Sequence, residues 1–288
     1  MAQPTINQTN PLTKFMRQPK IYITLPSGGN YWPKNSVAIP ENQQLPVYSM
    51  TAKDEILFKT PDALMNGQAV VDVIQSCIPN VKNAWNTPSI DLDMFLIAIR
   101  IATYGEKMEM TYTVPVINEE IDYEISLHQF IDQANSIQWV EQVPIDDDMI
   151  IFVKPLNYKH MTTISQRGFE TSKIMQISSN DSLTDDQKNS MIRDSFKSLT
   201  DLTTDIMVSS IFKIKTAEGD VTESRFIKEF IENADRSVVD TIQKHLTELK
   251  TRNEVKPLTM STTPEQQEAG APVSFEVPIN FDNATFFG

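Results

Sequence analysis

Hydrophobic residues in the first half of the chain recur at two spacings. Apolar and polar residues alternate over residues 108–116, as in a half-buried strand, and a second such run at residues 121–125 follows a turn. These two runs predict a β-hairpin. Other segments show the three- and four-residue spacing of an amphipathic helix. We predict strands at residues 21–25, 47–50, 108–116, 121–125, 137–143 and 149–153, and helices at residues 52–59, 62–66, 70–78, 89–104 and 127–134.

The helix at residues 89–104 is the most hydrophobic segment of the pattern. One side carries Ile90, Met94, Ile97 and Ile101, and further apolar residues occupy much of the remaining surface. A helix that is apolar on most sides belongs inside a core. We therefore expect this helix to be buried.

The second half of the sequence follows helical spacing. Apolar residues step by three and four along residues 157–177, 184–218, 222–231 and 235–252, with short polar turns between these segments. Gly219 ends the second of them. The pattern therefore predicts an all-helical region after Pro155.

The two ends of the chain differ from the middle in composition. Residues 1–19 are rich in Asn, Gln, Thr and Pro, and such a segment buries too little apolar surface to offset its ordering entropy. We expect a flexible N-terminal arm there. The predicted fold class is α+β: an N-terminal mixed α/β domain with short strands and hairpins at residues 20–154, a mainly α-helical C-terminal domain at residues 155–253, and an extended tail at residues 254–288 with a short terminal strand and an aromatic end.

Charge narrows the classes of partner. The 288 residues include 25 Lys and Arg against 38 Asp and Glu, for a formal net charge of −13. Nucleic acid and anionic membrane surfaces require a basic face, so we expect neither as a partner. The longest strongly apolar stretch is interrupted by Arg100 and is too short to cross a bilayer. The first residues lack the pattern of a signal peptide, and the single cysteine, Cys77, forms no intrachain disulfide, so a reducing cytoplasm is expected.

Candidate chemical groups are scattered along the sequence. His128, His160 and His245 show no spacing that would put two imidazoles on one helix face. Cys77 lies on the apolar side of a predicted helix, where a thiol packs as a small hydrophobic group with a raised pKa. We therefore predict no catalytic residue, no metal site and no cofactor.

Other polar groups have structural interpretations. Asp91 and Asp93 stand in the first turn of the helix at residues 89–104, where carboxylates face the positive end of the macrodipole. Residues 146–148 fit a solvated turn better than a cation site, because no Gly or distal Glu completes a calcium loop. Gly28 and Gly29 follow a strand, but no helix with Lys and Ser or Thr comes next, so they do not form a phosphate loop.

Five sequence stretches stand in an order that one family of proteins shares. They are LPSGG at residues 25–29 with Tyr31 and Pro33, VYSMTAKDEI at residues 47–56, TPDALMNG at residues 60–67, IQSCIP at residues 74–79, and DLD at residues 91–93 followed by IAIRIATYG at residues 97–105. In these stretches the chain resembles the T-even-like bacteriophage baseplate hub and hub-assembly proteins of contractile-tailed phages. A looser similarity extends the resemblance to residues 20–288.

The resemblance implies a non-enzymatic role in phage tail morphogenesis. We expect an assembly factor, or chaperone, for the baseplate hub that binds hub or tape-measure proteins in the host cytoplasm. The alternative is a permanent structural subunit of the baseplate hub in the virion. A cell-wall hydrolase is disfavoured, since the paired carboxylates of such an enzyme have no recognisable motif here. Self-association into a homo-oligomer stays open.

The resemblance also directs attention to the C-terminal segment. Relatives often carry paired cysteines of zinc-ribbon type there, whereas residues 261–265 of this chain contain no cysteine. A four-ligand zinc site is therefore not expected. Without a metal, residues 259–273 are expected to be flexible or to be ordered by a partner.

Aromatic side chains in one loop and at the C-terminal end are the predicted partner contacts. Such side chains dominate the energetics of protein interfaces. The alternative is that they anchor their own loop and tail to the core. The predicted contact residues are Gly28, Gly29, Tyr31, Trp32, Phe281, Phe286 and Phe287.

Overall fold

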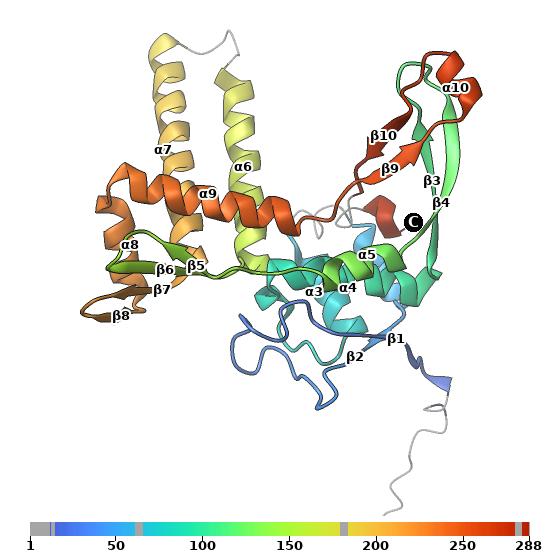
Figure 1. Ribbon diagram of the computed structural model, residues 1–288, viewed down its shortest axis with the longest axis horizontal. Coiled ribbons are helices and arrows are strands. Elements are labelled where there is room, and N and C mark those ends of the chain that lie inside the picture. Colours follow the sequence, from blue (N-terminus) through green and yellow to red (C-terminus); the bar gives the residue numbers. More distant parts are fainter. Residues whose placement is uncertain (1–11, 13–14, 61–65, 179–183, 280–283, 288) are drawn as a thin grey trace, which may run out of the picture.

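The protein is built from helices and small antiparallel sheets, which confirms the α+β class (Figure 1). The computed structural model describes residues 12, 15–60, 66–178, 184–279 and 284–287. Most of the predicted N-terminal arm and residues 62–65 of the predicted helix at residues 62–66 lie outside these residues. Within the described part, no helix combines the length and apolar character needed to cross a membrane.

The helix α4, Ser89–Tyr104, is the centre of the first hydrophobic core. Its residues 94–99 are completely buried, so other elements surround the helix on all sides. This confirms the predicted buried helix. The antiparallel strand pair β1–β2 and several short helices pack around it. These elements are β1 (Pro19–Ile23), β2 (Leu45–Tyr48), α1 (Ala52–Phe58), α3 (Gln68–Cys77), the 3-10 helix η2 (Ala84–Asn86) and α5 (His128–Asn135).

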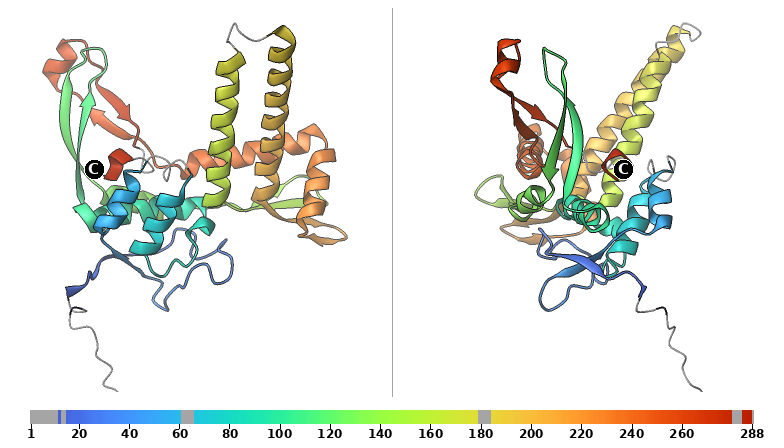
Figure 2. Two further views of the ribbon diagram at one scale, coloured as in Figure 1. Left: turned by 180° about the vertical axis from the view of Figure 1, so that it is seen from behind. Right: turned by 90° about the vertical axis from the view of Figure 1, so that its right-hand side faces the viewer.

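Two β-hairpins project from this core side by side (Figures 1 and 2). The first, β3–β4, is the predicted hairpin, and the second, β9–β10, comes from the C-terminal segment. Buried Tyr112, Met260 and Val277 join the two. The hairpins consist of β3 (Lys107–Thr113), β4 (Glu120–Ser126), β9 (Leu258–Ser261) and β10 (Ser274–Val277), with the helix α10 (Pro264–Glu268) at the tip.

The expectation that residues 259–273 need a partner or flexibility is wrong. Met260 is buried in the small cluster between the hairpins. The Thr262 hydroxyl donates a 2.6 Å hydrogen bond to the carbonyl of Pro272, and Thr263 caps α10 through a capping box with Gln266. The chain itself therefore orders this segment through contacts with β3–β4.

A four-stranded antiparallel sheet forms the second core, in the order β5–β6–β7–β8. Helices α8 and α9 and the end of α7 cover it. The predicted strand at residues 149–153 is confirmed as β6. Of the strand predicted at residues 137–143, only the last two residues are in a strand, β5, which begins at Gln142. The elements are β5 (Gln142–Pro144), β6 (Met149–Val153), β7 (Ile211–Thr216), β8 (Gly219–Val221), α8 (Ser224–Asn233) and α9 (Arg236–Asn253).

The prediction that residues 155–253 are all helical is wrong at β7 and β8. Ile211 continues the helical spacing of the preceding segment, which hides the end of the helix at Ser210. Ile211 and Ile214 are instead buried in the sheet, where β7 pairs with β6. The sheet therefore combines strands from both sides of the boundary predicted after residue 154.

Two long helices, α6 (Tyr158–Ser178) and α7 (Asp185–Ser210), lie side by side and extend away from the sheet (Figures 1 and 2). Thr184 and Gln187 form a capping box at the start of α7. We call this pair the α6–α7 hairpin.

Candidate interaction sites

A buried carboxylate holds the loop that contains the first group of predicted contact residues. Asp91 is completely buried at the start of α4. Its Oδ1 accepts a 2.8 Å hydrogen bond from the Ser27 backbone N–H, and its Oδ2 accepts bonds from the Ser27 hydroxyl at 2.6 Å and the Trp32 Nε1 at 2.7 Å. Gly28 and Gly29 adopt φ values of 61° and 86°, which permit the tight turn between these donors.

The interpretation of Asp91 as a helix-end charge missed this role. Burial raises the pKa of Asp91, and the hydrogen bonds from Ser27 and Trp32 act in the opposite direction. An acidic residue between Ile90 and Leu92 in an apolar helix was the available signal. Its partners are 59 and 64 residues away in sequence, so spacing alone could not identify them.

Tyr31 extends the same loop toward the strand β5. Its hydroxyl donates a 2.7 Å hydrogen bond to Glu141 Oε1, and its ring meets Trp139 edge-on at a centroid distance of 6.5 Å. Burial and the bond to Glu141 raise the pKa of Tyr31. Tyr31 and Trp32 are half-buried, whereas Gly28 is exposed. The loop thus presents its backbone and part of its aromatic surface to solvent.

The second group of predicted contact residues lies inside the first core. Phe286 and Phe287, in the 3-10 turn η3 (Ala284–Phe287), are each 3% exposed. The Phe287 ring stacks on Phe58 of α1 at a centroid distance of 4.4 Å, and Arg100 Nε donates a 2.9 Å bond to the Phe286 carbonyl. In this conformation the two phenylalanines anchor the tail to the core, which is the alternative that the sequence analysis left open for these residues. Phe281 lies outside the described residues.

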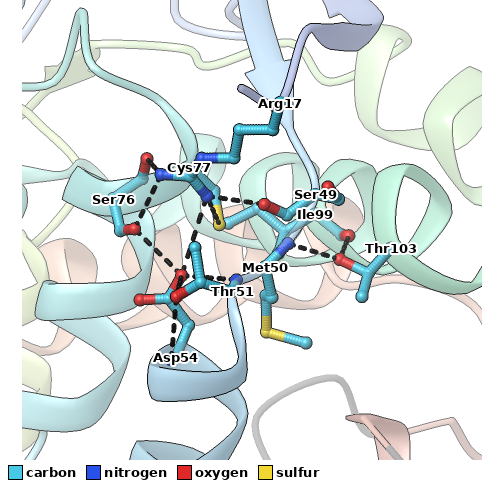
Figure 3. Close-up of polar contacts among 9 residues, drawn as sticks. All are labelled: Arg17, Ser49, Met50, Thr51, Asp54, Ser76, Cys77, Ile99 and Thr103. Carbon is cyan, nitrogen blue, oxygen red and sulfur yellow. Dashed lines mark hydrogen bonds and ion pairs between the residues drawn. The ribbon is translucent and has the colours of Figure 1, made fainter. Parts of the chain in front are cut away.

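Arg17 forms a polar network that the sequence did not predict (Figure 3). Its Nη1 donates to the Ser49 carbonyl at 2.6 Å, and its Nη2 donates to the Ser76 carbonyl at 2.6 Å and the Ser76 hydroxyl at 3.0 Å. Asp54 lies 3.7 Å from Nη1. The predicted flexible arm is therefore wrong for its last residues, because Arg17 fixes the chain just before β1.

Asp54 links this network to the start of α1. It accepts hydrogen bonds from the Ser76 hydroxyl at 2.9 Å and from the Thr51 hydroxyl and backbone N–H at 2.8 Å each. Cys77 lies beside the network and is completely buried. Burial and, next in size, the Asp54 charge raise the pKa of Cys77 to about 12. This agrees with its predicted role in packing.

An apolar groove of about 510 Å³ opens beside Arg17. Its lining is mainly apolar, from Met16, Tyr48, Met50 and Pro79, and Arg17 also borders it. Met16 is 53% exposed at the groove. Methionine side chains adapt to the shape of a bound group, so the groove suits an apolar side chain of a partner.

A second hollow, of about 870 Å³, is lined by residues of α6, α7 and α8, most of them polar or charged. Three of its lining residues form ion pairs, Arg167–Asp205 at 3.0 Å and Lys228–Asp205 at 3.8 Å. Among the described residues, no group of three or more His, Cys, Asp or Glu side chains is placed to hold a metal ion. The polar lining supplies ion pairs between helices.

Comparison with known proteins identifies the family. A family model described as T4 bacteriophage base plate protein matches residues 19–268. The chain therefore belongs to this family of phage baseplate proteins, which confirms the resemblance found in the sequence. No curated protein and no solved structure gives a match.

Proposed function

We propose that this baseplate-family protein is an assembly factor for the baseplate hub. It would bind hub or tape-measure proteins in the host cytoplasm before the tail tube forms, and it would act by binding and not by catalysis. The observation that carries this proposal is the family match over residues 19–268. Exposed apolar side chains on the described surface, such as Met16, Ile56 and Phe196, are consistent with a protein that holds others.

The groove beside Arg17 is our proposed contact for an apolar side chain of the partner. Its lining is apolar and adaptable, and Met16 at the groove is already half-exposed. A Met16→Lys substitution would put a charge at this contact and should reduce partner capture. Val273→Lys is the matched control, because Val273 is 69% exposed on the distant β9–β10 hairpin.

The loop from Gly28 to Trp32 is a second proposed contact. Asn30 is exposed at its centre, and its side chain does not take part in the bonds to Asp91. Asn30→Arg would therefore add bulk to the loop surface while leaving the loop anchored. Asn42→Arg, on another exposed turn, is the control. Equal partner capture by both variants would contradict a contact at this loop.

The family match also favours a second function, a permanent structural subunit of the baseplate hub. Both functions require binding to other tail proteins, and they differ in whether the protein stays in the particle. Quantitative mass spectrometry of purified tails, with known hub subunits as internal standards, separates them. Immunoprecipitation from infected-cell lysate identifies what the protein binds before assembly.

The assembly factor is expected to be depleted from purified tails and to co-precipitate hub or tape-measure proteins from lysate. Recovery in an integral ratio to hub subunits would instead establish a structural subunit. Failure to bind any tail protein in lysate, together with depletion from tails, would contradict both functions. The Met16→Lys and Val273→Lys pair then tests whether the binding uses the proposed groove.

A further inference from the structure

Helices cover one face of the four-stranded sheet β5–β8. Among the described residues, α8, α9 and the end of α7 pack against this face, and α9 is seen above the sheet in Figure 1. Because successive side chains of a strand point to opposite faces, the remaining sheet residues lie on the other face. We call that face, turned away from the helices, the outer face. The buried residues that point toward the helices are Val143, Ile151, Val153, Ile211 and Ile214.

The outer face carries two aromatic rings and two lysines. In the pairing of β6 with β7, Phe152 lies opposite Lys213 and Ile150 lies opposite Lys215, so these four side chains share one face. The register shift next to Phe152 leaves Phe212 as an extra residue of β7. The ring of Phe212 meets that of Phe152 edge-on at a centroid distance of 6.1 Å. All five side chains are half-buried or exposed, so solvent reaches this face.

The sequence of β6 indicates a covering layer on the outer face. β6 reads MIIFV at residues 149–153, so apolar residues point to both of its faces. A strand of an antiparallel sheet with one face in water normally alternates apolar and polar residues, as β3 does with KMEMTYT. An uninterrupted apolar run is typical of a strand that is covered on both faces. The described helices bury the inner face, so the second layer has to come from a partner.

Lysines make the outer face locally positive on a chain that is acidic as a whole. Lys213 pairs with Asp220 at 3.1 Å, and its Nζ lies 4.2 Å from the centre of the Phe152 ring. Lys215 is exposed, and no carboxylate of the described residues forms an ion pair with it. The net charge of the whole chain is −13. A partner that carries carboxylates is therefore attracted to this face and repelled by most of the remaining surface.

We propose that the outer face binds an acidic and apolar segment of another protein. An apolar side chain of the segment would pack on Phe152 and Phe212, and a neighbouring carboxylate would pair with Lys215. Nucleic acid also offers flat rings and negative charge, but its one charge per phosphate makes it the class that a chain of net charge −13 repels most. The outer face is separate from the groove beside Arg17 and from the loop at residues 28–32. This inference therefore goes beyond the proposed function, and either can fail alone.

Fluorescence anisotropy of the full chain with labelled synthetic peptides tests the charge half of the proposal. The probe is a short peptide in which Glu alternates with Leu and Phe, and the wild-type chain should bind it saturably. Lys215→Glu should raise the Kd about tenfold, because it places a like charge at the contact. Lys20→Glu is the matched control, since it makes the same change of charge at an exposed position on the strand β1. It should bind the peptide nearly as the wild type does.

A second pair of variants tests the apolar half. Phe212→Thr removes one ring of the outer face while keeping a residue that suits a strand, and it should also raise the Kd about tenfold. Tyr22→Thr is the control, because it removes a ring that is 57% exposed on β1. Circular dichroism should show every variant folded. A peptide with Ser in place of Leu and Phe should not bind the wild type.

Photochemical crosslinking locates the peptide without changing the protein. A probe that carries a benzophenone in place of one Phe should crosslink to residues of β6 and β7. Crosslinks confined to the groove beside Arg17 or to the loop at residues 28–32 would place the binding elsewhere.

Four other results would overturn the proposal. They are no saturable binding of the acidic peptide, equal binding of a peptide with Lys in place of Glu, and equal Kd values for Lys215→Glu and Lys20→Glu. The fourth is displacement of the acidic peptide by a single-stranded oligonucleotide at a lower concentration than the unlabelled peptide needs, which would assign the outer face to nucleic acid.

Discussion

Trp32 donates a 2.7 Å hydrogen bond from its indole Nε1 to Oδ2 of Asp91, which joins a surface loop to the first turn of the most buried helix. The same carboxylate accepts two bonds from Ser27 at the other end of the loop. One buried acid therefore fixes both ends of the segment that we propose as a partner contact. The shape of that contact depends on a residue that a partner cannot touch.

Replacement of Asp91 by Asn should destabilise the protein by about 2–4 kcal/mol. The amide keeps the size of the carboxylate but substitutes an NH₂ donor for one acceptor, and the groups around it are donors from Ser27 and Trp32. Urea denaturation followed by circular dichroism measures the change. The exposed Asp132→Asn serves as the control and should change stability by less than about 0.5 kcal/mol. Equal values for the two variants would contradict the role of Asp91.

The wild type and the Asp91→Asn variant also give a prediction for the pH dependence of stability. Burial raises the pKa of Asp91 above its ordinary value of 3.8, so the folded state holds this proton more strongly than the unfolded state. The contribution of Asp91 to stability is therefore largest at low pH and falls as the pH rises through its folded pKa. The wild type should gain stability relative to Asp91→Asn as the pH is lowered from neutral toward 3.8. A stability difference that shrinks over this range would contradict the raised pKa.

Elements with a strong, uninterrupted period could be predicted from the sequence. The helix at residues 89–104 and the hairpin β3–β4 are examples, because their patterns follow from contacts that each segment makes along its whole length. The strand β7 could not, since Ile211 satisfies the helical period and the sheet period equally well. Its conformation is decided by pairing with β6, about 60 residues earlier.

The candidate sites were less predictable than the fold. Aromatic residues were predicted as contacts because of their type, but Phe287 stacks on Phe58, which is more than 200 residues away. Arg17 stands in a segment of low apolar content. It donates hydrogen bonds to the backbone carbonyls of Ser49 and Ser76, and a sequence pattern does not reveal backbone acceptors. Composition is a property of the segment itself, whereas the burial of that segment depends on which other parts of the chain pack against it.

Arg17→Ala should lower the free energy of unfolding by about 2 kcal/mol. The guanidinium joins the carbonyls of Ser49 and Ser76, and without it Asp54 loses the neighbouring positive charge. Arg17→Lys should recover less than half of this loss, because a single ammonium cannot replace the planar fork. Urea denaturation measures both variants. The exposed Lys20→Ala should stay within about 0.5 kcal/mol of the wild type, and full recovery by Arg17→Lys would contradict the proposed geometry.

Gly67→Ala should destabilise the protein more than Gly28→Ala. Both glycines have left-handed φ values, 77° and 61°, so each substitution costs about 1 kcal/mol for the backbone. A Cβ at Gly67 would lie 2.9 Å from Thr162 Oγ1 and 3.2 Å from the Trp85 ring, whereas a Cβ at Gly28 meets only Asn30 Nδ2, at an ordinary contact distance of 3.8 Å. The contact with α6 should add about 1–2 kcal/mol at residue 67. Thermal and urea unfolding of both variants check this difference, and equal losses would show that α6 can move aside freely.

Phe287→Ala separates the anchoring role of the C-terminal turn from a role in partner binding. The ring is 3% exposed and stacks on Phe58, so its removal should cost about 3–5 kcal/mol of stability, while Phe287→Leu should cost clearly less because it keeps more of the apolar volume. Deletion of residues 279–288 would remove this packing together with any contact surface, so it cannot tell the two roles apart. The leucine variant keeps the core filled but removes the aromatic ring. Partner capture from lysate should therefore be unchanged by Phe287→Leu. A loss of capture in this folded variant would show that the turn leaves the core and that Phe287 contacts the partner directly.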